Sequence, residues 1–132
     1  MCPGTYSEQV TVPAGKNKLT LESVKPQQAI IQAPATIALV SPKAIVRVNG
    51  ADETSIRDLT ITGPGPAGCD SIEYGVRVDT GGSAAIEGNH ITKIEDTPFS
   101  GCQNGVAIQV GRDGTGSTPP DVTTGSALIR TT

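Results

Sequence analysis

Apolar and polar residues alternate in short runs along most of the chain. The clearest runs are residues 10–12, 45–48, 76–78 and 106–110, and clusters of glycine, proline, asparagine and aspartate separate them. Alternation with a period of two residues predicts β-strands that bury one face. No stretch shows the spacing of an amphipathic helix. We therefore predict an all-β protein made of many short strands.

Two strand motifs recur along the chain. The sequence Gly-Val-Arg-Val at 75–78 returns as Gly-Val-Ala-Ile at 105–108. Likewise, Gly-Ser-Ala-Ala-Ile at 82–86 returns as Gly-Ser-Ala-Leu-Ile at 125–129. The second interval is longer than the first because a loop insertion, residues 111–124, lies between the copies. Short strands that recur at such intervals are typical of solenoids.

These repeats predict a parallel β-helix, a solenoid with three short strands in each coil. We expect about five coils of roughly 22–30 residues each, all in one domain that spans the whole chain. An up-and-down antiparallel barrel is the competing architecture, but the hairpin signals are poor. Hydrophobic residues make up 36% of the chain and aromatic residues only 2%, which suits a narrow interior filled by small and β-branched side chains.

Charge and hydropathy exclude two classes of partner. The chain carries 10 Lys and Arg against 13 Asp and Glu, a formal net charge of −3 without a basic patch. We therefore expect no nucleic-acid partner. No apolar run reaches the length of about 18 residues that a membrane-spanning helix needs, so we also expect no membrane span.

Three segments resemble one superfamily. Residues 4–13, followed by Lys-Leu-Thr-Leu at 18–21, are similar to the opening of pectin lyase-like right-handed parallel β-helix proteins. Residues 56–63 and 85–91 resemble the right-handed β-helix repeat of the same superfamily, as in NosD-type repeat proteins. The resemblance covers nearly the whole chain and implies a right-handed helix.

The resemblance specifies a fold and leaves the activity open. The superfamily includes lyases, hydrolases, esterases, epimerases and non-catalytic surface proteins. The resemblance also implies a secreted or cell-surface protein, and a fragment of a longer solenoid that is truncated at both ends. Uncapped terminal coils expose unpaired strand edges, which predicts end-to-end self-association.

The three cysteines predict one disulfide. Neither a Cys-x-x-Cys motif nor a nearby histidine accompanies Cys2, Cys69 and Cys102, which argues against a zinc site. Within the repeat implied by the resemblance, Cys69 and Cys102 each precede a Gly-Val strand in adjacent coils, so we expect them to pair and Cys2 to lack a partner. Three buried free thiols are the alternative.

The sequence contains no complete catalytic set. The aspartate-bearing segment of the pectin methylesterases is absent, and no carboxylate cluster fits a pectate lyase-like calcium site or a hydrolase-like acid pair. Activity as a polysaccharide lyase or hydrolase therefore stays open. Ca²⁺ as a cofactor has no clear site, and we expect no cofactor.

One predicted sheet face carries candidate ligand-binding residues. If Val76 and Val78 point inward, Arg77 and Asp79 point outward. Alignment of the two Gly-Val copies places Asp79 beside an outward Gln109 and Arg77 beside Ala107. An outward arginine, aspartate and glutamine could bind the hydroxyl or carboxylate groups of a sugar, and a solvated sheet face is the plainer reading.

The insertion extends this candidate site because loops on a rigid scaffold often carry specificity. It contributes Arg112 and Asp113 as further candidates. We hypothesise a non-catalytic β-helix segment of a secreted or cell-surface protein that presents this face to a polysaccharide. The alternatives are a fragment of a polysaccharide lyase, hydrolase or esterase whose catalytic coils lie outside the chain, and a purely structural stalk.

Overall fold

The structure, a computed structural model, describes residues 1–40, 42–95, 105–113 and 122–130. These residues form β-strands and one short 3₁₀ turn at Gly68–Asp70, which confirms the all-β prediction. The strands are β1 (Gly4–Ser7), β2 (Val10–Pro13), β3 (Thr20–Glu22), β4 (Ala29–Gln32), β5 (Ala44–Asn49), β6 (Thr54–Arg57), β7 (Thr60–Thr62), β8 (Tyr74–Asp79), β9 (Gly82–Glu87), β10 (His90–Thr92), β11 (Val106–Val110), β12 (Arg112–Asp113), β13 (Val122–Thr123) and β14 (Gly125–Arg130).

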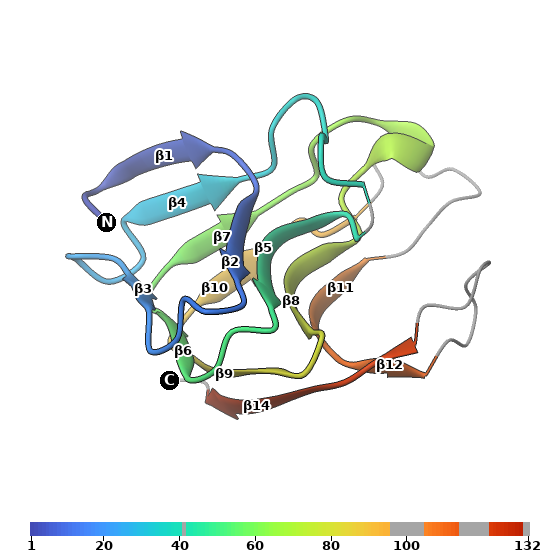
Figure 1. Ribbon diagram of the computed structural model, residues 1–132. Helices are drawn as coiled ribbons and strands as arrows, with labels where there is room; N and C mark the ends of the chain where they lie inside the picture. Colours follow the sequence, from blue (N-terminus) through green and yellow to red (C-terminus); the bar gives the residue numbers. More distant parts are fainter. Residues whose placement is uncertain (41, 96–104, 114–121, 131–132) are drawn as a thin grey trace.

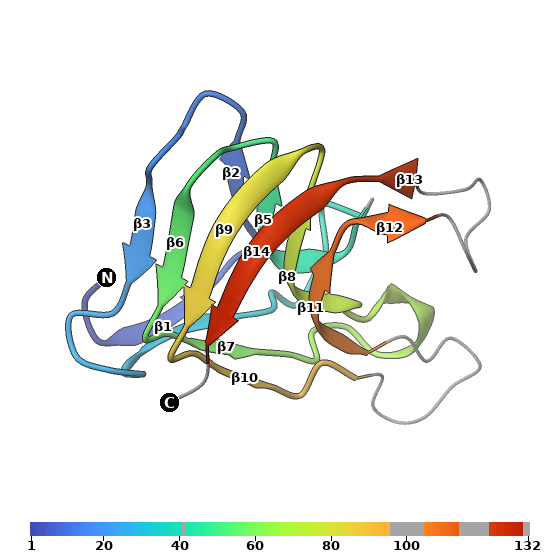
Figure 2. The ribbon, with the colours of Figure 1, turned by 90° about the horizontal axis from the view of Figure 1, so that it is seen from below.

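The strands form three parallel sheets that the chain visits in turn. Sheet A has the order β1-β4-β7-β10, sheet B has β2-β5-β8-β11, and sheet C has β3-β6-β9-β14. Figure 1 shows the strands of sheets A and B side by side, and Figure 2 shows those of sheet C. Each sheet has four strands, so the described chain makes four rounds where the sequence predicted about five coils. The rounds are long, since Thr60 pairs with Ile30 in the round before it and with His90 in the round after it.

Apolar side chains at matching positions of successive rounds build the core. The columns include Val46–Val76–Ile108 and Val48–Val78–Val110 in sheet B. Val76 and Val78 are fully buried, as the alternation predicted. Leu, Ile, Val and Ala supply most of the buried surface, so the core forms almost without aromatic residues.

The predicted register between β8 and β11 is wrong by two residues, one full period of a β-strand. Val76 pairs with Ile108 and Arg77 with Gln109, whereas the repeated Gly-Val motif aligned Val76 with Val106 and Arg77 with Ala107. The shift arises in the connection from sheet A to sheet B. The connection from β10 to β11, residues 93–105, is longer than the connection from β7 to β8, residues 63–73. The alignment of 82–86 with 125–129 is confirmed, since Gly82 pairs with Gly125 and Ile86 with Ile129.

The cysteines are only partly covered by the described residues. Cys2 is exposed and carries a free thiol. Cys69 is disulfide-bonded. Cys102 lies outside the described residues, so the pairing of Cys69 with Cys102 stays a prediction.

Candidate ligand-binding groove

The outer face of sheet B carries a short row of charged residues. Arg47 on β5 pairs in register with Arg77 on β8, and Asn49 pairs with Asp79. Val46 and Val48, which flank Arg47 on its strand, are fully buried. Alternation along a strand therefore turns the arginine to the opposite, outer face.

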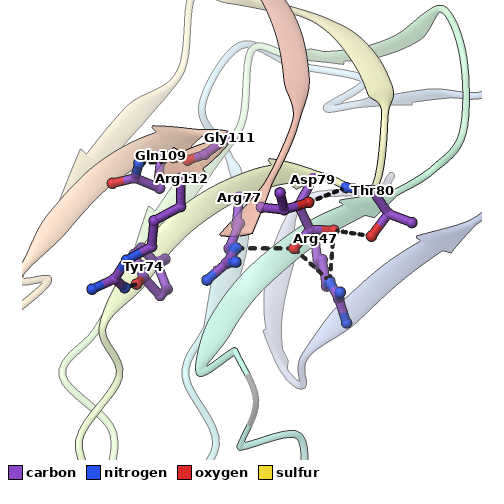
Figure 3. Close-up of polar contacts among 9 residues, drawn as sticks. Arg47, Tyr74, Arg77, Asp79, Thr80, Gln109, Gly111 and Arg112 are labelled. Atoms are coloured by element: carbon purple, nitrogen blue, oxygen red, sulfur yellow. Dashed lines mark hydrogen bonds and ion pairs between the residues drawn. The ribbon is translucent and has the colours of Figure 1, made fainter. Parts of the chain in front are cut away.

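Asp79 is the centre of this row. Its two carboxylate oxygens accept hydrogen bonds from Arg47 Nε at 3.1 and 3.0 Å. Arg77 Nε forms an ion pair with Asp79 Oδ2 at 2.9 Å, and Thr80 Oγ1 donates to Asp79 Oδ1 at 3.1 Å. Figure 3 shows Arg47 and Arg77 converging on this one carboxylate. Asp79 therefore pairs with two guanidinium groups at once.

The prediction that Arg77 and Asp79 lie open on a solvated face is wrong, because they are only 3% and 1% exposed. Parts of the insertion lie over this face. Strands β12 and β13 form an antiparallel pair, and the hydroxyl of Thr123 accepts a 2.7 Å hydrogen bond from Thr80 N. The guanidinium of Arg77 also lies over the ring of Tyr74, 5.1 Å from its centre.

The structure brings most of the predicted site residues to the same face. Gln109 lies beside Arg77 rather than Asp79, and its amide donates to Gly111 O at 2.6 Å. Arg112 donates to the hydroxyl of Tyr74. Asp113 pairs through its backbone with Val122, and its side chain lies outside the described part of the chain. Gln109 and Arg112 thus lie near the cluster, and their part in ligand binding stays a prediction.

Arg47 was not among the predicted site residues. Its strand, Ile-Val-Arg-Val at 45–48, has the same alternation as Gly-Val-Arg-Val at 75–78, and that likeness was the available signal. The side chain of Arg47 is 26% exposed, so it is the solvent-facing arginine of the cluster. Among the described residues it makes hydrogen bonds through Nε alone, which leaves its two Nη groups for a ligand.

Two adjoining hollows, here called the outer groove, share Arg47 and Pro42. The larger has a volume of about 570 Å³, and the smaller of about 260 Å³ lies over the cluster. The residues that line the larger hollow are Thr11, Ala38, Leu39, Val40, Pro42, Ala44, Arg47 and Asn49. The residues that line the smaller one are Pro42, Arg47, Arg77, Asp79, Thr80, Val122 and Thr123. The larger hollow falls within the volume range of small-molecule sites.

Gln9 fixes one wall of the outer groove. Its Nε2 donates to Leu39 O at 2.9 Å and to Ala44 O at 3.1 Å. Its Oε1 accepts from Ala38 N at 3.1 Å and from Leu39 N at 2.9 Å. Three of these bonds fasten the loop between β4 and β5 in Figure 1, and the fourth reaches Ala44, the first residue of β5.

In the described ranges, no group of three or more His, Cys, Asp and Glu side chains is placed to hold a metal ion. Within those ranges, no helix has the length and hydropathy to cross a membrane.

Comparison with known proteins adds no assignment. No protein-family model, no curated protein and no solved structure matches the chain.

Proposed function

We propose that the chain is a right-handed parallel β-helix that binds an acidic polysaccharide in the outer groove, as a non-catalytic part of a secreted or cell-surface protein. The strand order supports the architecture, because each sheet is parallel and the chain passes through the other two sheets before it returns. Crossovers between parallel strands of one sheet are right-handed in about 98% of cases, which supports the handedness.

The observation that carries the binding proposal is Arg47. A guanidinium that is held by Nε keeps its Nη donors in a fixed direction, and two parallel N–H donors match a carboxylate. The Arg47 guanidinium favours a uronate over a neutral sugar, because a hydrogen bond between two charged groups is stronger than one to a neutral hydroxyl. Thr11 and Asn49 add hydroxyl and amide groups for sugar hydroxyls, and Leu39 and Val40 add apolar surface for ring faces.

A structural role is the second candidate. The near-complete burial of Arg77 and Asp79 favours it, because a buried ion pair of this kind can hold neighbouring strands of sheet B in place without any ligand. The two candidates differ at Arg47, since only the binding proposal needs its Nη groups. A stalk would tolerate the loss of that guanidinium without any change in a binding property.

Binding to polygalacturonate, measured by isothermal titration calorimetry, tests the proposal. We expect Arg47→Ala to weaken binding about tenfold or more, since a hydrogen bond to a charged group contributes about 1.5–3 kcal/mol. Arg57→Ala is the matched control. Arg57 also pairs through Nε, at 3.0 Å from Glu22 Oε2, but on sheet C. It should bind like the unchanged chain.

A neutral β-glucan serves as the control ligand. The proposal expects binding to polygalacturonate that weakens with salt, and little binding to the neutral polymer. Equal binding by Arg47→Ala and the unchanged chain would place the ligand elsewhere. A folded chain that binds neither polymer would favour the structural role.

A further inference from the structure

Among the described residues, no strand covers either end of the three-sheet stack. The edge strands are β1, β2 and β3 at one end and β10, β11 and β14 at the other. None of these six pairs with a further described strand on its outer side. Such edges present unpaired backbone N–H and C=O groups that can template pairing with another chain.

The apolar columns are open at the same two ends. Of the column that contains Leu21, Ile56, Ile86 and Ile129, the two middle residues are buried. Leu21 is only half-buried, and Ile129 is 48% exposed. The partly buried apolar residues against the core gather in the first and last rounds and the segments that adjoin them: Met1, Tyr6, Val10, Leu19, Leu21, Ile91, Ile94, Ile108, Val110 and Ala127. Each end is therefore an apolar cross-section of the core.

A column of alternating charge runs along the outside of sheet C. Glu22 pairs in register with Arg57, Arg57 with Glu87, and Glu87 with Arg130. The first pair is an ion pair at 3.0 Å. The column therefore ends in a negative charge at β3 and a positive charge at β14.

We propose that copies of this chain stack head to tail, with β10, β11 and β14 of one copy against β1, β2 and β3 of the next. This arrangement continues all three sheets in the same direction. It sets Arg130 beside Glu22 of the next copy and Ile129 beside Leu21, so both the charge column and the apolar column continue. Joining two like ends would instead bring together ends whose terminal charges have the same sign.

The N-terminal residue borders this interface without filling it. The ammonium group of Met1 donates to Glu22 O, and Met1 O accepts from Val24 N at 2.8 Å. These contacts lie at the end of β3. Thr20, at the start of the strand, stays exposed, and β1 and β2 stay at the edges of their sheets.

Head-to-tail stacking makes a specific prediction about mass. The two surfaces differ, so the assembly does not close and adds copies without limit. Light scattering coupled to size-exclusion chromatography should give a weight-average mass that rises continuously with concentration above the 13.4 kDa of one chain. A constant monomer mass would overturn the proposal. A plateau at twice that mass would overturn it too, because it indicates a closed dimer.

Two lysine variants on one strand locate the interface. Ile129 and Leu128 are 48% and 54% exposed, and they lie on opposite faces of β14. Ile129→Lys places a charge in the open apolar column and should keep the protein monomeric. Leu128→Lys makes the same charge change on the outer face and should associate like the unchanged chain. Equal behaviour of the two variants, with circular dichroism showing both folded, would contradict the proposal.

The charge column gives an independent check. Arg130→Gln removes the terminal charge and should weaken association about two- to fivefold. Arg57→Gln makes the same charge change one round in from the β3 end, but it removes the partner that competes for Glu22 and should therefore not weaken association. A loss of association in Arg57→Gln as large as that in Arg130→Gln would show that net charge, and not the interface, governs assembly.

Discussion

The two kinds of arginine–carboxylate pair in this protein differ in burial. Asp79 is 1% exposed and forms ion pairs with two arginines, whereas Glu22 pairs with Arg57 on an open sheet face. Exposed pairs contribute little to folding because water and salt screen them. Breaking a buried pair is costly because the remaining charge loses its counter-ion where water cannot replace it.

Asp79→Ala should therefore lower the free energy of unfolding by about 3 kcal/mol. The buried Arg77 loses the carboxylate oxygen that lies 2.9 Å from its Nε. Glu22→Ala is the matched control and should cost less than about 1 kcal/mol. Urea denaturation followed by circular dichroism measures both. A loss below about 1 kcal/mol in Asp79→Ala would show that the cluster does not stabilise the fold.

At the scale of elements, the sequence pattern predicts the strands better than it predicts the connections between them and the segments that cover them. Alternation locates the strands of sheet B, because burial of every second residue leaves a mark on the sequence. The alignment error at β11 arises in a connection, where no periodicity fixes the length. The burial of Arg77 and Asp79 was missed for the same reason, since segments without alternation cover them.

The wall of the outer groove, the segment around Leu39, is held by the side chain of Gln9. Gln9→Ala removes three hydrogen bonds to the segment around Leu39 and one to Ala44 O at the start of β5, but it leaves the strand pairing of the sheets intact. We expect faster amide hydrogen exchange at Ala38 and Leu39, because both N–H groups lose their acceptor. Hydrogen exchange followed by mass spectrometry measures this effect.

Gln28→Ala is the control for that experiment. Gln28 is exposed, and its side chain makes no hydrogen bond to another described residue. Exchange around Leu39 should match that of the unchanged chain. Unchanged exchange in Gln9→Ala would show that the wall is held by other contacts. A global rise in exchange would show that Gln9 supports the sheets themselves.

At the scale of the whole molecule, the sheets serve as a rigid support for surfaces at different places. The outer groove lies on one flank, over sheet B, and the open edges lie at the two ends of the stack. A stack of copies would therefore repeat the groove once per copy along its length. Repeated weak sites suit a polymeric ligand, because linked sites bind more tightly than one alone.

The sequence accounts for this organisation in part. The parallel strands follow from short alternating runs that recur at intervals typical of a solenoid. The sequence does not predict the outer groove, because the groove forms where the insertion and the segment before β5 approach the same face of sheet B. Arg47 and Arg77 sit in identical local patterns, each between two valines, yet only the structure shows that Arg47 is partly exposed and Arg77 is buried.

The most direct test of the binding account is an amide chemical-shift titration with a soluble oligogalacturonide. The protein is held below the concentration at which its mass begins to rise. We expect the largest shifts at Arg47, Thr80 and Thr123, which line the outer groove. Shifts concentrated on sheet C, around Arg57 and Glu87, or no shifts at saturating ligand, would contradict the account.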